Sequence, residues 1–235
     1  MELMADYVNL TDIRAVAMAL ENLEEKAVFV GGATVQLYAS GYAATESRPT
    51  QDIDVVIALV SYSDSTELDR KLVNLGFKND VMSGVICRYI YQDIVVDVMP
   101  TESSSLGFSN RWYAEGINQA ILYPIDSESS IYIFTAPYFL ASKLEAFKSY
   151  RHGKDFRMNS DFEDIIYVFD NRIEIENEIR NSPVSVRKYL AKELKNLLNH
   201  PDIQEGISVH LEYSTSGQRT QRILTIWDNF IKTVW

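Results

Sequence analysis

The chain has 235 residues, 46% of them hydrophobic and 23% charged, an ordinary composition for a globular protein with a hydrophobic core. Its formal net charge of -11 argues against general binding to nucleic acid, because an acidic surface repels the phosphate backbone. The chain has a single cysteine, which excludes an internal disulfide. Its longest apolar run, residues 55–60, is too short to span a membrane, and its first segment lacks the pattern of a signal peptide. We therefore expect a cytoplasmic protein without a membrane partner.

Residues 1–135 have the pattern of an α/β region. A helix is expected from Thr11, whose hydroxyl suits an N-cap, and a second, short helix is expected over 33–40, directly after the Gly31-Gly32 turn. A third helix, starting near residue 65, is expected to stop at Gly76. Strands rich in β-branched residues are expected at 27–30, 52–60, 85–92, 94–100 and 130–136, with a tight connection at Gln92-Asp93.

The pattern changes at Pro137, which suits the start of a helix. Helical spacing of apolar residues then continues through four segments, 137–151, 160–172, 182–200 and 218–235. The predicted class is therefore α/β of the α+β kind, with an α/β core over 1–135 and a helical region over 136–235.

Three aspartates stand within apolar runs that are expected to form strands. Asp52 and Asp54 alternate along one strand, so their side chains point to the same face. Asp97 lies in another strand, and the three carboxylates converge if the two strands are neighbours. Carboxylates this close repel one another unless a cation lies between them, and Mg²⁺ prefers such oxygen ligands. A role in a turn or as a helix-cap partner is the alternative for the Asp-x-Asp pair.

The pair Gly31-Gly32 lies between an expected strand and an expected helix. Glycine lets the backbone approach a ligand closely, and the N-terminus of the helix offers free N–H groups to a phosphate. A tight turn that needs positive φ explains the same pair without a ligand. The segment lacks the Gly-x-Gly-x-x-Gly and Gly-Lys-Ser/Thr patterns, which excludes a Rossmann fingerprint and a P-loop.

Together these features resemble the nucleotidyltransferase fold of the DNA polymerase beta superfamily, and most closely its bacterial AbiEii/MenT-like branch. In that branch a Gly-Gly turn is followed by Arg-x-Ser/Thr-x-Asp-Ile-Asp, which matches Arg48, Thr50, Asp52, Ile53 and Asp54. The spacing from Gly32 to Asp52 is longer than in the minimal superfamily motif. The branch's later Lys-Leu-x-Ala…Arg…Lys/Arg-Asp…Asp-x-x-Asp pattern matches Lys143, Arg151, Asp155, Asp161 and Asp164. The resemblance covers residues 28–172, and residues 175–235 carry no motif.

The resemblance implies a small mixed sheet flanked by helices, with NTP as substrate and Mg²⁺ on Asp52, Asp54 and Asp97. Asp97 would be the third carboxylate and a general base on an attacking hydroxyl, and Lys143 would hold the triphosphate. The residues expected to contact the nucleotide are Gly31, Gly32, Thr34, Arg48, Thr50, Lys143, Arg151, Asp161 and Asp164. Members of the branch act as toxins of toxin–antitoxin or phage-defence pairs, which implies a cognate antitoxin as partner.

The charges of the helical half also have simpler explanations. Lys143 and Arg151 lie eight residues apart on one side of an expected helix, which a solvated helix face explains equally. Asp161 and Asp164 would orient these cations or approach the metal. A capping box of Ser160 with the glutamate three residues later explains the same helix start without catalysis. The basic run 148–157 suits either an RNA acceptor or a solvated loop.

Three functions stay open from the sequence. The first is an enzyme that transfers a nucleoside monophosphate from an NTP to RNA, protein or a small molecule and releases pyrophosphate. The second is a non-catalytic module of the same fold that binds a nucleotide or a protein. The third is a metal-dependent phosphotransferase or phosphohydrolase that uses the same carboxylates.

Overall fold

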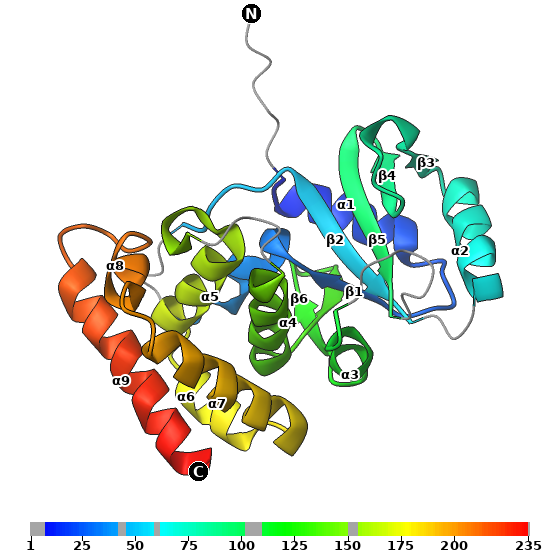
Figure 1. The fold of residues 1–235 in the computed structure, drawn as a ribbon. Coiled ribbons are helices and arrows are strands. Elements are labelled where there is room, and N and C mark those ends of the chain that lie inside the picture. The colour runs from blue at the N-terminus through cyan, green and yellow to red at the C-terminus, as the bar shows by residue number, and fades with distance from the viewer. Residues whose placement is uncertain (1–7, 42–45, 59–61, 102–109, 150–154, 235) are drawn as a thin grey trace, which may run out of the picture. The chain divides into compact units, whose positions relative to one another are not determined.

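The computed structural model describes residues 8–41, 46–58, 62–101, 110–149 and 155–234. The chain divides into two compact units (Figure 1), which are described separately below. The first unit takes in the described parts of Met1–Thr34 and Arg48–Thr135, and the second those of Val35–Ser47 and Ala136–Trp235. Residues 35–47 therefore belong with the helical part of the chain, although they precede most of the sheet in sequence. Arg151 and the middle of the basic run 148–157 lie outside the described residues.

The first unit is built on a mixed sheet, which has seven strands in the described part of the chain. Its order is β3-β4-β5-β2-β1-β7-β6. The strands are β1 (Ala27–Val30), β2 (Asp52–Ile57), β3 (Lys78–Asn79), β4 (Arg88–Tyr91), β5 (Ile94–Pro100), β6 (Ile121–Pro124) and β7 (Ser130–Ile133). β2 runs antiparallel to β1 and parallel to β5, and β1 runs parallel to β7. The mixed sheet, followed in the chain by helices, confirms the predicted α+β class.

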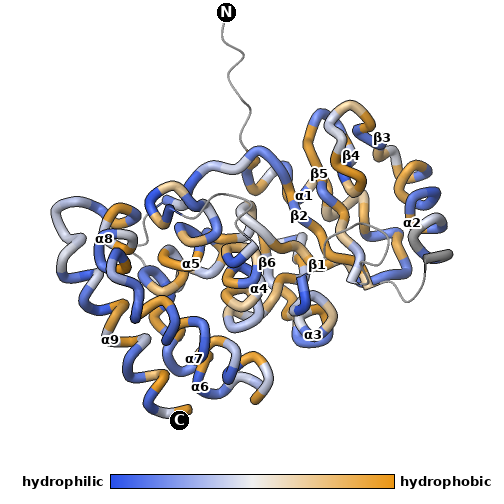
Figure 2. Tube along the Cα trace, in the orientation of Figure 1, coloured by the Kyte–Doolittle hydropathy of each residue, from blue (hydrophilic) through white to orange (hydrophobic). Residues whose placement is uncertain are grey.

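The central strands are buried because their side chains are apolar on both faces. In β2, Ile53 and the run from Val55 to Ile57 are fully buried, and β1 contributes Val28 and Phe29 to the same core. Such β-branched and aromatic residues favour extended backbone in a packed interior. Figure 2 shows hydrophobic residues along β1, β2 and β5. The apolar setting makes the aspartates of these strands exceptional.

The hairpin of β4 and β5 turns at Gln92 and Asp93, which both have positive φ, at 48° and 68°. Two consecutive residues with positive φ form the two-residue turn whose twist matches that of antiparallel strands. The predicted tight connection is therefore confirmed. The strand pairing places Tyr91 opposite Ile94 and Arg88 opposite Asp97.

Helices of the first unit flank the sheet. They are α1 (Leu10–Leu20), α2 (Tyr62–Asn74), α3 (Tyr113–Asn118) and the short 3₁₀ helix η2 (Val81–Ser83). The N-cap of α1 is Asn9, which forms a capping box with Asp12, so the expected cap at Thr11 was wrong by two residues. The helix expected over 33–40 is a 3₁₀ helix, η1 (Gly32–Tyr38), whose later residues belong to the second unit.

The second unit consists of helices that pack on one another. They are α4 (Ala136–Lys148), η3 (Phe156–Met158), α5 (Ser160–Asn171), α6 (Ile175–Asn181), α7 (Val184–Leu198), α8 (Ile203–Ser208) and α9 (Ser216–Val234). α4 packs against α5 and α7, and α7 packs against α9. Fully buried residues such as Phe139, Phe162 and Trp227 fill the space between these helices. Figure 2 shows hydrophilic and hydrophobic residues alternating along α7 and α9, as expected of helices with one buried face.

The N-cap of α5 is Asn159, whose side chain accepts a hydrogen bond from the backbone N–H of Phe162. Ser160 is instead the first helical residue, so the N-cap predicted there was wrong by one position, and Phe162 at N3 cannot complete a capping box. Asparagine and serine are both good caps, and the sequence alone does not choose between adjacent ones. Among the helices that the structure describes, none has both the length and the hydrophobicity needed to cross a bilayer.

An ion-pair cluster fastens α9 to α5. The carboxylate of Asp170, with 1% of its side chain exposed, accepts hydrogen bonds from Arg219 and from Arg222, whose Nη2 lies 2.6 Å from Oδ1. The bond to Asp170 raises the pKa of Arg219. Buried charges are stable only when paired, so removal of one partner costs far more than the pair contributes.

We expect Asp170→Asn to lower the free energy of unfolding by about 3 kcal/mol, since both arginines lose their charged acceptor in a buried site. Urea denaturation followed by circular dichroism measures this change. The matched control is Asp228→Asn, which removes an exposed partner of Lys232 on the same helix and should cost less than about 0.5 kcal/mol. Equal losses for the two variants would contradict the buried clamp.

Candidate functional site

The sheet of the first unit brings the three aspartates to one face. β2 and β5 are parallel neighbours, and Asp54 lies directly opposite Asp97. Asp52 lies two residues before Asp54 on the same strand, so its side chain leaves the sheet on the same side. Asp97 is buried, whereas Asp52 and Asp54 are half-buried. The backbone therefore places three carboxylates together in a mostly apolar sheet.

Arg88 of β4 lies against these carboxylates. Its Nε and Nη2 donate to the two oxygens of Asp97, each at 2.8 Å, and Nη2 also lies 3.3 Å from Oδ2 of Asp52. The bidentate bond to Asp97 raises the pKa of Arg88, so the guanidinium stays charged. Within the described ranges, no three side chains of His, Cys, Asp or Glu are placed so that they hold a metal together. In this arrangement Arg88 compensates one of the three negative charges of the site.

The glycine turn is fitted to Asp54. Gly31 has a φ of 71°, which is the left-handed conformation that glycine favours. A Cβ at this position would lie 1.8 Å from Oδ2 of Asp54, so no other residue leaves room for the carboxylate. The hydroxyl of Thr34 donates to the carbonyl oxygen of Gly31 at 3.0 Å and holds the turn closed. The turn therefore needs glycine both for its backbone and for the side chain of Asp54.

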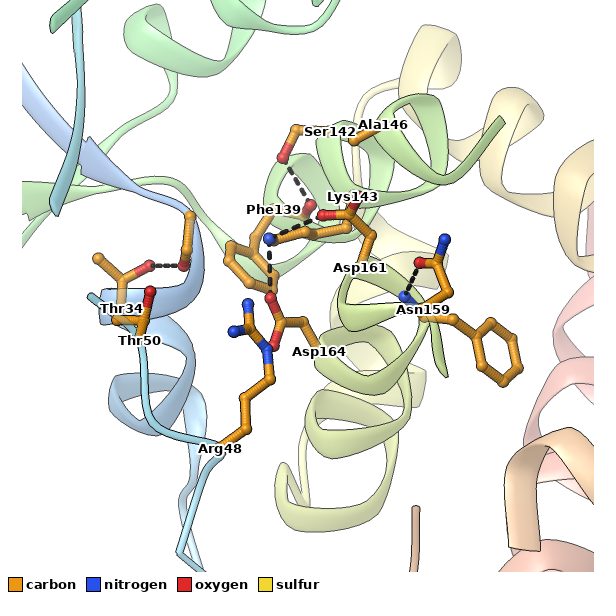
Figure 3. Close-up of polar contacts among 12 residues, drawn as sticks. Thr34, Arg48, Thr50, Phe139, Ser142, Lys143, Ala146, Asn159, Asp161 and Asp164 are labelled. Carbon is orange, nitrogen blue, oxygen red and sulfur yellow. Dashed lines mark hydrogen bonds and ion pairs between the residues drawn. The ribbon is translucent and has the colours of Figure 1, made fainter. Parts of the chain in front are cut away.

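Gly32 lies against the segment that precedes β2. A Cβ on Gly32 would lie 2.7 Å from Nη2 of Arg48 and 3.3 Å from Oγ1 of Thr50. The Thr50 hydroxyl in turn donates to Oδ1 of Asp52 at 3.0 Å and orients that carboxylate. Figure 3 shows Thr34, Arg48 and Thr50 in this part of the first unit. The structure thus brings the glycine pair, Arg48, Thr50 and the Asp-x-Asp pair together.

The donor atoms of this site are of the kind that a divalent cation binds, although no three of the described His, Cys, Asp or Glu side chains are grouped around one point. It supplies three carboxylates, the hard oxygen donors that Mg²⁺ binds, and Gly31 gives up its side-chain space to one of them. The oxygens of Asp97 face Arg88, however, so a cation that used Asp97 would have to compete with the guanidinium. The short η1 offers a weaker dipole than a long α-helix, and the space beside the two glycines is taken by Asp54, Arg48 and Thr50.

Lys143 belongs to a separate cluster in the second unit. Its Nζ lies 3.0 Å from Oδ1 of Asp161 and 2.7 Å from Oδ2 of Asp164, as Figure 3 shows. All three residues are buried, so a solvated helix face does not explain Lys143. The two aspartates lie one helical turn apart on α5 and orient the lysine of α4 between them. Asp155, by contrast, is exposed and caps η3, and its bonds to Arg157 hold its pKa at about 2.

The sequence interpretation missed Arg88. The information was present, because a two-residue turn at Gln92-Asp93 fixes the register of the hairpin and so places residue 88 opposite residue 97. An arginine directly opposite an aspartate in a strand pair is a favourable cross-strand pair.

Comparison with known proteins does not assign the chain to a family. No protein-family model matches the sequence, and no curated protein matches it. The nucleotidyltransferase resemblance accordingly stays a prediction that rests on the motif residues.

Replacing Gly31 tests its contact with Asp54. We expect Gly31→Ala to destabilise the protein by about 2–4 kcal/mol, because left-handed backbone strain adds to the displacement of the carboxylate. Gly84→Ala is the matched control, since Gly84 has a φ of 72° and nothing within 4 Å of its missing Cβ. That variant should lose only about 1–2 kcal/mol. Urea titrations that gave equal losses would contradict the contact.

Replacing Lys143 tests the buried cluster of the second unit. We expect Lys143→Met to lower the free energy of unfolding by about 3–5 kcal/mol, because two buried carboxylates lose the cation between them. The control Lys192→Met, at an exposed position of α7, should change it by less than about 0.5 kcal/mol. Thermal or urea denaturation of both variants measures the difference, and a neutral Lys143→Met would show that the cluster is not buried.

Proposed function

We propose that this protein is a metal-dependent nucleotidyltransferase that moves a nucleoside monophosphate from an NTP to the hydroxyl of an acceptor. The observation that carries the proposal is the pairing of Asp54 with Asp97 across β2 and β5, with Asp52 on the same face and Gly31-Gly32 beside them. Carboxylates from neighbouring strands next to a glycine turn and an arginine suit the binding of a triphosphate with its cation. The motif resemblance supports the same chemistry independently of the strand pairing.

Each residue of the site has a role in this proposal. Asp52, Asp54 and Asp97 would hold Mg²⁺, which when bound neutralises the triphosphate and the departing pyrophosphate. The Gly31-Gly32 turn leaves room for the carboxylate of Asp54, and Arg48 beside Gly32 adds positive charge for a phosphate. Thr50 holds Oδ1 of Asp52 in place through its hydroxyl.

The transfer itself is a displacement at the α-phosphorus of the NTP. The acceptor oxygen forms a bond to that phosphorus, the bond to the bridging oxygen breaks, and pyrophosphate leaves with the electron pair. Asp97 would take the proton of the acceptor hydroxyl. Lys143, Arg151, Asp161 and Asp164 enter as nucleotide-binding residues from the motif resemblance alone.

The acceptor is proposed at the level of its reacting group, an oxygen nucleophile on RNA, a protein side chain or a small molecule. The acidic chain favours a protein or small-molecule acceptor over RNA, because its net charge of -11 repels a polyanion. We further propose a cytoplasmic toxin that is held in check by a cognate antitoxin, as the resembling branch suggests.

One observation favours a second candidate, a non-catalytic module that binds a nucleotide or a protein. Arg88 occupies both oxygens of Asp97 and contacts Asp52, which is how a purely structural ion-pair cluster would look. In that case the carboxylates stabilise the sheet, and no nucleotide is consumed.

Transfer of labelled nucleotide separates these functions. The protein is incubated with Mg²⁺ and α-labelled or γ-labelled NTPs, together with total cellular RNA and protein. We expect α-label in an acceptor, and a loss of about 100-fold or more in Asp54→Asn, because the site loses a charge that neutralises the transition state. Asp93→Asn, an exposed aspartate in the turn of the same sheet, is the control and should keep full transfer.

Each other outcome of this labelling experiment contradicts the nucleotidyltransferase proposal. Transfer of γ-label or release of free phosphate would replace the proposal with a phosphotransferase or phosphohydrolase. NTP binding without any turnover would support the non-catalytic module, and equal transfer by Asp54→Asn and the unaltered protein would place the chemistry elsewhere.

A further inference from the structure

Arg88 is in contact with two of the three carboxylates that the proposed function assigns to the metal. The fork of its guanidinium takes both oxygens of Asp97, and Nη2 reaches Oδ2 of Asp52 at 3.3 Å. These are the atoms that a divalent cation would need as ligands. A positive side chain and a metal ion therefore have the same binding partners on this face of the sheet.

The charges explain why a cation is needed there in every state of the protein. Asp52, Asp54 and Asp97 carry three negative charges on one face, and carboxylates this close repel one another. Arg88 compensates one of these charges through a bidentate bond, which has the strongest geometry available to an arginine. The side chain of Arg88 is largely buried, with 25% exposed, so water screens its attraction to Asp97 only in part.

The strand register makes Arg88 a fixed part of the site. The turn at Gln92-Asp93 sets Arg88 opposite Asp97, so its side chain leaves the sheet on the same face as the three aspartates. Asp54, in contrast, occupies the space that is left because Gly31 has no side chain. Asp97 is thus bound by the arginine, Asp52 by both the arginine and the hydroxyl of Thr50, and Asp54 lies in the space left at Gly31.

We propose that Arg88 is a built-in counter-cation of this site, which a divalent metal must displace from Asp97 and Asp52 in order to bind. The inference rests on the proposed function for the presence of the metal, and it adds a residue that sets the metal affinity. The guanidinium keeps the carboxylates in place while no metal is bound, and it leaves them when the metal takes over their oxygens. Arg88 is a positioning residue in this scheme, because it acts on the reaction through Asp97 and Asp52.

Metal affinity is the direct measure of this competition. Mn²⁺ binding is determined by calorimetry or electron paramagnetic resonance for the unaltered protein and for Arg88→Gln. We expect Arg88→Gln to bind Mn²⁺ about 10- to 100-fold more tightly, since the metal no longer has to break hydrogen bonds between charged groups. The control Arg14→Gln removes an exposed arginine of the same unit, which pairs with Asp126 and Glu128, and should leave the affinity unchanged.

A second variant is used because Arg88→Gln leaves Asp97 without its charged partner and can therefore prevent folding. Arg88→Lys keeps the positive charge but lacks the fork that binds both oxygens of Asp97. We expect its Mn²⁺ affinity to lie between those of the unaltered protein and Arg88→Gln. Circular dichroism establishes which variants are folded. If Arg88→Gln is unfolded, the Mn²⁺ affinity of Arg88→Lys tests the proposal in its place.

The displacement is also visible in the unaltered protein. The Nε–H of Arg88 donates to Asp97 at 2.8 Å, and we expect this bond to slow its exchange with water and to shift its nuclear magnetic resonance signal. Saturation with diamagnetic Mg²⁺ should remove this protection, and the signal is assigned by its absence from Arg88→Lys. A signal that stays protected at saturating Mg²⁺ would overturn the proposal.

The failure of this inference is distinct from the failure of the proposed function. Equal or weaker Mn²⁺ binding by the folded Arg88 variants overturns the role of Arg88 and leaves the transferase proposal standing. Absence of Mn²⁺ binding from every variant overturns both the counter-cation and the metal of the proposed function. Binding by Arg88→Gln together with weak binding by the unaltered protein is the outcome that we expect.

Discussion

The parallel pairing of β2 with β5 is the constraint on which the candidate site depends. It sets Asp54 opposite Asp97, and the alternation of side chains along β2 then puts Asp52 on the same face. The hairpin that joins β4 to β5 adds Arg88 to this face in a register fixed by its turn. Three adjacent strands thus place three negative charges and one positive charge in a small part of an otherwise apolar sheet.

This cluster stands in contrast to the ion pairs of the second unit. There the buried aspartates meet cations from neighbouring helices, Asp170 with two arginines and Lys143 with two aspartates. Both clusters fasten helices to one another. In the sheet, the negative charges outnumber Arg88 by three to one, and the glycine turn beside them is shaped around Asp54. In the proposed function these carboxylates are the groups that bind a cation.

Much of this arrangement follows from the sequence. The β-branched runs indicate the central strands, the Gln92-Asp93 pair indicates the hairpin, and the alternation of Asp52 with Asp54 indicates their common face. The adjacency of β2 and β5 does not follow, because it depends on pairing between segments that are distant in the chain. Arg88 was missed because the hairpin register was not extended from the turn to the fourth pair. The edge strands β3 and β6 are short and exposed, so they lack the apolar alternation that marks a strand.

Other differences arise from tertiary packing. Lys143 resembles any charged residue on a helix face until the two aspartates of α5 are placed beside it. The described residues of 35–47 come soon after the glycine turn, yet they group with the helices of the second unit, which no local pattern indicates. The turn of the β4–β5 hairpin has a further consequence. Since successive side chains alternate between faces, inserting one residue between Gln92 and Asp93 would shift the pairing by one and turn Arg88 to the opposite side of the sheet. The length of this two-residue loop therefore decides which side of the sheet carries Arg88, so natural variation in loop length here would change the charge of that face without altering any charged residue.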